Sequence, residues 1–134
     1  MKIVVADASA IVEYLLRTES ATSIERVITG VDSDLHIPAL CDVEVCSALR
    51  RALLERRLSE ERAKEALRDY SDLPVSRHGH LMFVERVLQL RRNFSACDAT
   101  YVALAEYLKA IFVTADHSLA RAVREFFPKW DVRA

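Results

Sequence analysis

Two kinds of segment alternate along this chain. Short runs rich in β-branched and aromatic residues, beginning with KIVVA at residues 2–6, have the length and composition of buried strands. Longer segments between them carry apolar residues at helical spacing, as in ACDATYVALAEYL at residues 96–108. Such alternation, with short connections, is typical of an α/β fold in which helices cover both faces of a parallel sheet.

The same pattern gives expected bounds for each element. Strands are expected at residues 2–6, 34–38, 73–76 and 110–115. Helices are expected at residues 9–17, 20–28, 39–57, 80–92, 96–108 and 118–127, with a further helix that starts after a cap at Ser59. Gly30 should end the second helix. Ser95 should cap the helix expected at residues 96–108. A last strand within KWDVRA is barely legible from the pattern.

Length and charge restrict the organisation of the chain. With 134 residues, of which 51% are hydrophobic, one core is expected, so residues 1–134 should form one domain. The formal net charge of -1 excludes the strongly basic composition typical of nucleic-acid binding, but a local basic face remains compatible with it. Most basic residues are Arg, which suits phosphate recognition, although solvated helix faces explain most of them equally well.

Cysteine usage and hydropathy indicate a compartment. Cys41, Cys46 and Cys97 are odd in number and lack metal-ligand spacing, so they are expected to be small core residues in a reducing environment. No segment approaches 18 uncharged apolar residues, and the N-terminus lacks the apolar stretch of a signal peptide. We therefore expect a soluble, cytoplasmic protein without a membrane partner.

Four acidic residues are expected to meet at one edge of the sheet. Asp7 follows the first strand and Asp116 follows the strand at residues 110–115, so both lie where parallel strands deliver their carboxyl ends. Glu44 lies in the early turns of the helix that starts at this edge. Asp98 is in the first turn of a helix that must also start there, because it runs back to the beginning of the next strand.

Such a cluster of acids favours a divalent cation. Val102 and Ala105 follow Asp98 at helical spacing, which places this carboxylate on the core-facing stripe. Burial of an unpaired carboxylate costs several kcal/mol, and neighbouring carboxylates also repel one another. Mg²⁺ takes oxygen ligands and is held by a few carboxylates together with substrate phosphates. The turn after the first strand is therefore expected to be half of a metal site.

Each acid also has a purely structural explanation. Asp7, Asp98 and Asp116 suit helix caps or first-turn positions, and Glu44 suits a surface acid paired with Arg51. Shared placement at one edge is what favours a site. Thr114 can orient water beside Asp116 or simply serve as a turn residue. The four histidines are scattered, and His78 and His80 are expected in a solvated loop.

Four motifs, in this order, resemble the PIN-domain family, and specifically the VapC-type toxins of type II toxin-antitoxin pairs. They are VVADASAIVEYLL, PALCDVEVCSALRRAL, SACDATYVALAEYL and FVTADHSLARA. The resemblance covers nearly the whole chain. It implies a Rossmann-like five-stranded parallel sheet of order 3-2-1-4-5 and an endoribonuclease that uses Mg²⁺ or Mn²⁺. It also implies a homodimer that is held inactive by a small antitoxin.

The family's acids map onto Asp7, Glu44, Asp98 and Asp116, with Thr114 as the supporting hydroxyl. Asp7 and Asp98 are expected to ligate the metal directly, and Glu44 and Asp116 directly or through water. Metal-held water then attacks phosphorus without a nucleophilic side chain. Arg51 is expected to contact RNA phosphates. An apolar groove near Val12, Leu15 and Leu16 is expected to accept an amphipathic antitoxin segment.

Other functions are considered beside this one. A phospho-receiver module would need an adjacent acid pair after the first strand and a late Lys, and the ADAS and TADHS turns supply neither. A haloacid-dehalogenase-like phosphatase would need Asp where Ser9 stands. An RNA-processing nuclease without an antitoxin, and a non-catalytic module that binds Mg²⁺, remain open alternatives, although all four acids are present.

Overall fold

A parallel sheet organises the chain, and its five strands lie in the order β3-β2-β1-β4-β5. The computed structural model describes residues 1–19 and 21–134. The strands are β1 (Lys2–Ala6), β2 (Ser33–Pro38), β3 (Val75–His78), β4 (Ile111–Val113) and β5 (Val132–Arg133). All four neighbouring pairs are parallel. The predicted α/β class and strand order are confirmed.

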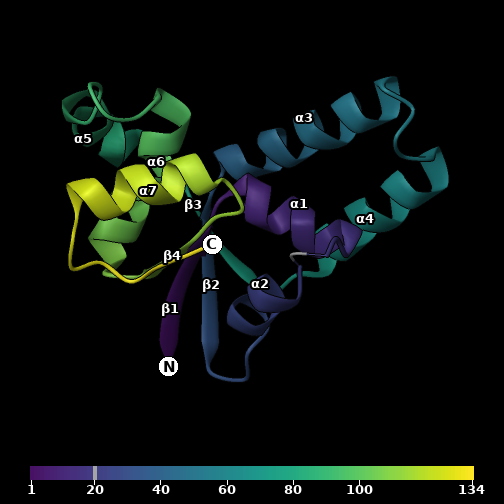
Figure 1. The fold of residues 1–134 in the computed structure, drawn as a ribbon, viewed down its shortest axis with the longest axis horizontal. Coiled ribbons are helices and arrows are strands. Elements are labelled where there is room, and N and C mark those ends of the chain that lie inside the picture. Colours follow the sequence, from purple (N-terminus) through teal and green to yellow (C-terminus); the bar gives the residue numbers. More distant parts are fainter. Residues whose placement is uncertain (20) are drawn as a thin grey trace.

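Helices connect every pair of successive strands. They are α1 (Ala8–Leu16), α2 (Ala21–Ile28), α3 (Leu40–Leu54), α4 (Glu60–Asp72), the 3₁₀ turn η1 (Leu81–Phe83), α5 (Val84–Gln89), α6 (Ala96–Leu108) and α7 (His117–Phe126). Helices α1 to α4 lie on one side of the sheet, and α5, α6 and α7 lie on the other (Figure 1). The change of side follows from the topology, because right-handed crossovers that run in opposite directions along a sheet place their helices on opposite faces.

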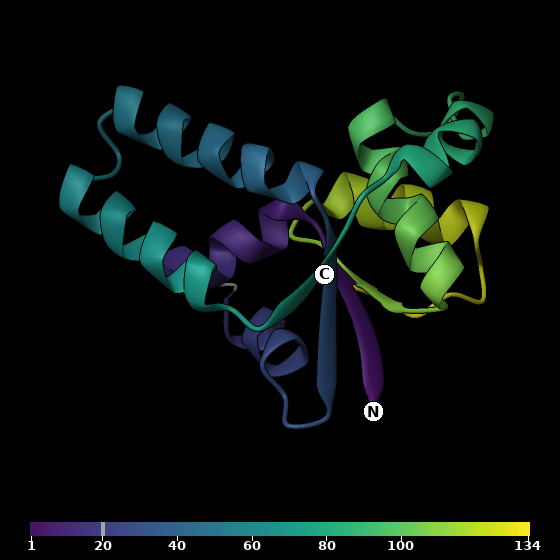
Figure 2. The ribbon, with the colours of Figure 1, turned by 180° about the vertical axis from the view of Figure 1, so that it is seen from behind.

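Helices α3 and α4 form an antiparallel pair that projects away from the sheet, and α1 lies beside α4. Figure 2 shows the same arrangement from behind. The guanidinium of Arg62 on α4 donates to the carbonyl oxygen of Leu15 at the end of α1, with a distance of 2.6 Å. This bond satisfies one of the carbonyls that a helix end leaves without an intrahelical partner.

Several predicted bounds were wrong by a few residues. The helix expected at residues 39–57 ends at Leu54, and Arg56 then adopts a positive φ of 58° that turns the chain toward α4. The strand expected at 73–76 begins at Val75, because Leu73 is held extended before Pro74 as the C-cap of α4. The helix expected at 80–92 is split into η1 and the short α5. The predicted start of the second helix at Ser20 lies outside the described residues.

The core is centred on α6. Its residues from Ala99 to Ala105 are buried without interruption, so this helix is covered on all sides instead of presenting one apolar stripe. Tyr101, Phe112, Ile11 and Ile37 are among the largest fully buried side chains. Within the described residues, no helix is long and apolar enough to cross a membrane.

Two expectations about side chains need correction. Cys41 is buried as expected, but Cys46 and Cys97 are exposed, because they lie on the outward sides of α3 and α6. His78 is not in a solvated loop: it ends β3, and its Nε2 lies 2.8 Å from Nδ1 of His36 on the neighbouring strand. The adjacent parallel strands place the two rings 5.0 Å apart, in a stacked arrangement.

Candidate functional site

The register of the sheet brings Asp7 and Thr114 together. Ala6 is aligned with Val113 across β1 and β4, so the next residue of each strand emerges at the same point of the carboxyl edge. The Thr114 hydroxyl donates to Oδ2 of Asp7 with a distance of 2.6 Å. Asp7 is 5% exposed and Thr114 is fully buried. The expected neighbouring position of these two strand ends is therefore confirmed.

Asp7 also starts α1. Its Oδ1 accepts from the backbone N–H of Ala10 at 3.0 Å and from the hydroxyl of Ser9 at 2.7 Å. The Ser9 hydroxyl in turn accepts from the backbone N–H of Ala115 and lies 3.2 Å from the Thr114 hydroxyl. Ser9 is a member of the site that sequence reasoning missed. Its position two residues after the capping Asp was the available signal.

Asp98 lies among the other three acids. Burial raises the pKa of Asp98, and the charges of Asp116 and Glu44 raise it further, against a lowering contribution from Ser95. Burial likewise raises the pKa of Asp7. Hydrogen bonds from Thr114, Ser9 and Ala10 lower this pKa in part, and the negative charge of Asp98 raises it by a smaller amount. Charges shift each other's pKa in this way only when they lie close together. The end of β1 and the helices α3, α6 and α7 therefore contribute to a single acidic cluster.

The four acids differ in local role. Asp7 and Asp116 are both N-caps, since Oδ1 of Asp116 accepts from the backbone N–H of Leu119 at the start of α7. Asp98 is not a cap, because Ser95 caps α6. Glu44 is half-buried within α3, past its first turn. The structural explanation is therefore correct for Asp7 and Asp116 as caps and for Asp98 as a first-turn acid of α6. It is insufficient for Glu44, which is half-buried and has no ion pair with Arg51 among the described residues.

Among the described residues, no ion pair neutralises this cluster. None of the ion pairs found there includes Asp7, Glu44, Asp98 or Asp116. An excess of negative charge with carboxylate and hydroxyl oxygens is a donor set that hard cations prefer. In residues 1–19 and 21–134, no three or more acidic, histidine or cysteine side chains lie in an arrangement that would by itself hold a metal ion. A cation at this cluster would therefore need further ligands, such as water or substrate phosphate.

Arg51 lies away from the acids. It is exposed near the end of α3, seven residues after Glu44, so about 10 Å of helix separate the two along the axis. An arginine at this distance cannot contact the acids directly. Its predicted contact with RNA phosphates stays a prediction.

Two further side chains adjoin the cluster and were not expected there. Cys97 is exposed beside Asp98, and burial together with the charges of Glu44 and Asp98 raises the pKa of its thiol. Tyr101 lies one turn after Asp98 on α6, and burial and the neighbouring Cys41 and Glu44 raise the pKa of its hydroxyl. Their spacing of one residue and one helical turn from Asp98 was the signal that could have identified them.

Comparison with known proteins agrees with this geometry. The family model described as PIN domain matches residues 4–125. Ribonuclease VapC12 of Mycobacterium tuberculosis is 36% identical over 119 residues, which cover 89% of this chain and 91% of the relative. Ribonuclease VapC9 of the same organism is 39% identical over 117 residues, which cover 87% of this chain and 88% of the relative.

Two solved structures share the fold. The M. tuberculosis toxin VapC20, which is named for cleavage of the sarcin-ricin loop, has a TM-score of 0.65 at 16% identity and covers 89% of this chain and 94% of its own. PAE2754 of Pyrobaculum aerophilum has a TM-score of 0.66 at 23% identity, covering 98% of this chain and 83% of its own. The family match, the identity to curated relatives and the strand order agree: this chain belongs to the PIN-domain family and, within it, to the VapC-type ribonucleases.

Proposed function

We propose that this protein is an endoribonuclease toxin of the VapC type, which cleaves RNA phosphodiester bonds with Mg²⁺ or Mn²⁺ held at the acidic cluster. The observation that carries the metal-dependent part is the position of Asp98, which is half-buried beside the charges of Asp7, Glu44 and Asp116, and none of these acids has an ion pair within the described residues. The relatives that are 36–39% identical are named as ribonucleases, which supports RNA as the substrate.

Each acid receives a role from its surroundings. Asp7 and Asp98 are the proposed direct ligands, because burial makes their charges the ones that most need compensation. Glu44 and Asp116 complete the cluster directly or through water. A bound divalent ion would lower the pKa of coordinated water, orient it for in-line attack on phosphorus and stabilise the charge of the leaving oxygen.

Thr114 and Ser9 keep the first ligand in place. The Thr114 hydroxyl donates to Asp7 Oδ2 and accepts from the backbone N–H of Asp116, so one side chain ties the ends of β1 and β4 to the start of α7. Ser9 holds the other oxygen of Asp7. Because these bonds leave Asp7 one orientation, the cluster is organised before any ion or RNA arrives.

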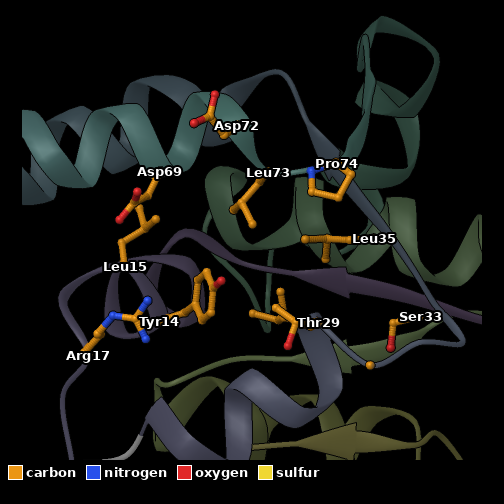
Figure 3. Close-up of a pocket in the computed structure, with 12 residues that line it drawn as sticks. Tyr14, Leu15, Arg17, Thr29, Ser33, Leu35, Asp69, Asp72, Leu73 and Pro74 are labelled. Carbon is orange, nitrogen blue, oxygen red and sulfur yellow. The ribbon is translucent and has the colours of Figure 1, made fainter.

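The proposed inhibitory partner is a small antitoxin whose amphipathic segment binds on the α1, α2 and α4 side. A hollow of about 390 Å³ lies there between these helices and β2, as Figure 3 shows. Tyr14 and Leu73 give it apolar walls, and Arg17 and Asp72 lie at its rim (Figure 3). Mixed apolar and charged lining of this kind suits an amphipathic peptide.

The hollow differs from the groove expected from the sequence. Leu15 borders it, whereas Val12 and Leu16 pack against the core. The hollow lies at the far end of α1 from Asp7, and nine helical residues span about 14 Å. A bound segment would therefore have to continue along α1 to place an Arg or Lys against the acids.

We also propose that the active form is a homodimer. Five large side chains on η1, α5 and α6 are more than half exposed. These residues, which we call the α5 patch, are Leu81, Met82, Val84, Leu88 and Tyr107. A group of exposed apolar side chains in one region is typical of a protein interface.

Cleavage of RNA in defined metal conditions tests the proposed function. Purified protein should cut a fluorescent RNA that contains single-stranded and looped regions in Mg²⁺ or Mn²⁺ and should be inactive in EDTA. Asp98→Asn should abolish cleavage, while its circular dichroism matches that of the wild type. Undiminished cleavage in EDTA, or full activity of Asp98→Asn, would contradict the proposal. The 5′ ends of the products would identify the cleaved sequence.

A further inference from the structure

The hydroxyl of Tyr101 is unusual within this fold. It is the one buried side-chain oxygen or nitrogen in the described part of the chain without a well-formed hydrogen bond, although the Glu44 carboxylate and the Cys41 thiol lie close to it. The residue is 2% exposed and has apolar neighbours on α6, including Ala99, Val102 and Leu104. Burial of a hydroxyl without a good hydrogen-bond partner is costly, and phenylalanine at this position would avoid that cost.

Two helices bring this hydroxyl to the acidic cluster. Asp98 and Tyr101 are three residues apart on α6, and Cys41 and Glu44 are three residues apart on α3, so each pair shares a helix face. Glu44 acts on Asp98, and both Cys41 and Glu44 act on Tyr101. The start of α3 and the start of α6 are therefore close together, and the phenol lies near the Cys41 thiol and the Glu44 carboxylate.

Of the groups near the phenol, Glu44 is the stronger acceptor. A carboxylate accepts hydrogen bonds strongly, whereas a thiol sulfur is a weak acceptor. The Cys41 thiol is buried, and its pKa of about 11, raised by burial, keeps it neutral at physiological pH. A hydrogen bond to Glu44 would therefore satisfy the phenol better than one to Cys41.

We propose that Tyr101 is a positioning residue for Glu44. Its hydroxyl donates to one Glu44 oxygen when that side chain turns toward the cluster, so that the other oxygen faces the cation and its water. This inference rests on the proposed function, because it requires a cation at the cluster. The phenol would thereby gain the acceptor that it lacks, and Glu44 would be held in one orientation.

Cys97 is the competing donor to Glu44. Its thiol is exposed and is a weak donor, so it orders the carboxylate less than a buried phenol does. Cys97→Ala should therefore leave cation binding within twofold of the wild type. This variant separates the contribution of the phenol from that of the thiol.

Cation binding measured by thermal shift tests the inference without RNA. Melting temperatures are recorded across a Mg²⁺ titration for wild type, Tyr101→Phe and the matched control Tyr107→Phe, whose hydroxyl is exposed on the same helix. Tyr101→Phe should raise the Mg²⁺ concentration at half-maximal shift about 10-fold. In EDTA it should melt at or above the wild-type temperature, because a buried unpaired hydroxyl is removed. Tyr107→Phe should match the wild type.

Glu44→Gln shows whether Tyr101 acts through Glu44. If it does, adding Tyr101→Phe to Glu44→Gln should cause no further loss of Mg²⁺ affinity, since coupled residues are not additive. The cleavage rates of these variants should rank as their Mg²⁺ affinities do. At a fixed low Mg²⁺ concentration, Tyr101→Phe should reduce kcat and leave the KM for RNA unchanged.

The outcomes separate this inference from the proposed function. If Mg²⁺ stabilises the wild type but not Asp98→Asn, and Tyr101→Phe shifts the midpoint, both stand. The inference is overturned, and the metal site stands, if Tyr101→Phe reaches its half-maximal shift at the same Mg²⁺ concentration as the wild type. The same holds if the loss of Mg²⁺ affinity caused by Tyr101→Phe adds fully to the loss caused by Glu44→Gln. If Mg²⁺ shifts neither the wild type nor Asp98→Asn, the metal site is overturned, and the inference with it.

Discussion

The two oxygens of Asp7 have different partners. Oδ1 accepts from Ala10 and Ser9 and so starts α1, whereas the partner of Oδ2 in the described structure is the Thr114 hydroxyl. Asparagine at this position would preserve the cap and place an NH₂ group against a hydroxyl that donates. Its effect on stability would therefore mix cap, hydrogen bond and charge. Asp98, which caps no helix, isolates the effect of charge.

The first prediction concerns Asp98→Asn. In EDTA the variant should melt about 4 °C higher than the wild type, because one member of a repelling cluster is neutralised, an effect of about 1 kcal/mol. Excess Mg²⁺ should raise the melting temperature of the wild type by mass action and that of the variant far less. Differential scanning calorimetry in both buffers provides the measurement. A variant that melts lower in EDTA would show that Asp98 is a structural residue.

The second prediction is a pH dependence with a defined sign. Burial raises the folded-state pKa of Asp98 above its ordinary value of 3.8, so the folded protein binds more protons than the unfolded chain between these values. The stability contributed by this proton is complete below the ordinary value and is lost as pH rises through the raised pKa. Other carboxyls, such as Asp131 beside Arg133, have lowered pKa values and act in the opposite sense.

The difference between wild type and Asp98→Asn isolates this contribution from that of the other carboxyls. Urea unfolding without metal should show the variant gaining on the wild type as pH rises from 4 to 7. Parallel pH profiles of the two proteins would contradict the prediction.

The third prediction concerns Thr114. Thr114→Val removes a hydroxyl that donates to Asp7 and accepts from the backbone of Asp116, and it leaves the buried Asp7 carboxylate and the part-buried Asp116 N–H without that partner. The free energy of unfolding should fall by about 1–3 kcal/mol, and cleavage should fall strongly. Thr114→Ser keeps the hydroxyl and loses one methyl group, so it should cost about 1 kcal/mol and retain cleavage. Equal activity of the two variants would remove Thr114 from the site.

At the level of elements, the features that hydrophobic periodicity and helix caps determine were predictable from the sequence. The order of strands and helices, the caps at Ser59 and Ser95 and the burial of β1 all follow from local patterns. Residues 80–92 show the limit, because their helical pattern continues across a point where the backbone forms a 3₁₀ turn. Such breaks depend on packing against α6, where Phe83 contacts Tyr107 edge-on.

The candidate site was predictable to the same extent. Asp7 and Asp116 follow strands, so topology alone places them at one edge. Ser9 and Tyr101 stand at short spacings from Asp7 and Asp98, but these spacings did not suffice, because the roles of both residues also depend on the distance between α1, α3, α6 and β4, which a periodic pattern does not contain. The pairing of His36 with His78 was missed for the same reason, since it depends on the register of two strands far apart in sequence.

The fourth prediction compares two helix caps. Ser59→Ala and Ser95→Ala each remove a side-chain acceptor for the third backbone N–H of a helix, so each should cost about 1 kcal/mol of unfolding free energy. Only Ser95 caps the helix that carries Asp98. Ser95→Ala should therefore also reduce cleavage severalfold, whereas Ser59→Ala should retain wild-type kcat. Both quantities come from chemical denaturation and single-turnover kinetics on the same preparations. Equal activities would show that the first turn of α6 does not position the acid.

At the level of the whole molecule, acidic and apolar surfaces are separated. The acids gather at the carboxyl edge of the sheet, and the α5 patch lies on η1, α5 and α6. The hollow proposed for an antitoxin segment lies on the opposite side, between α1, α2 and α4 (Figure 3). A second copy bound at the α5 patch would therefore leave the hollow free for an antitoxin.

The fifth prediction is that the α5 patch forms the homodimer. Leu88→Glu places a charge among five exposed large side chains, and burial of an unpaired charge is costly enough to separate two copies. Leu54→Glu is the matched control, because Leu54 is almost equally exposed, 67% against 66% for Leu88, but lies at the far end of α3. Sedimentation velocity across a concentration series should show a dimer for the wild type and Leu54→Glu and a monomer for Leu88→Glu. Dissociation by Leu54→Glu alone would move the interface to α3, and a monomeric wild type at every concentration would leave the patch to the antitoxin.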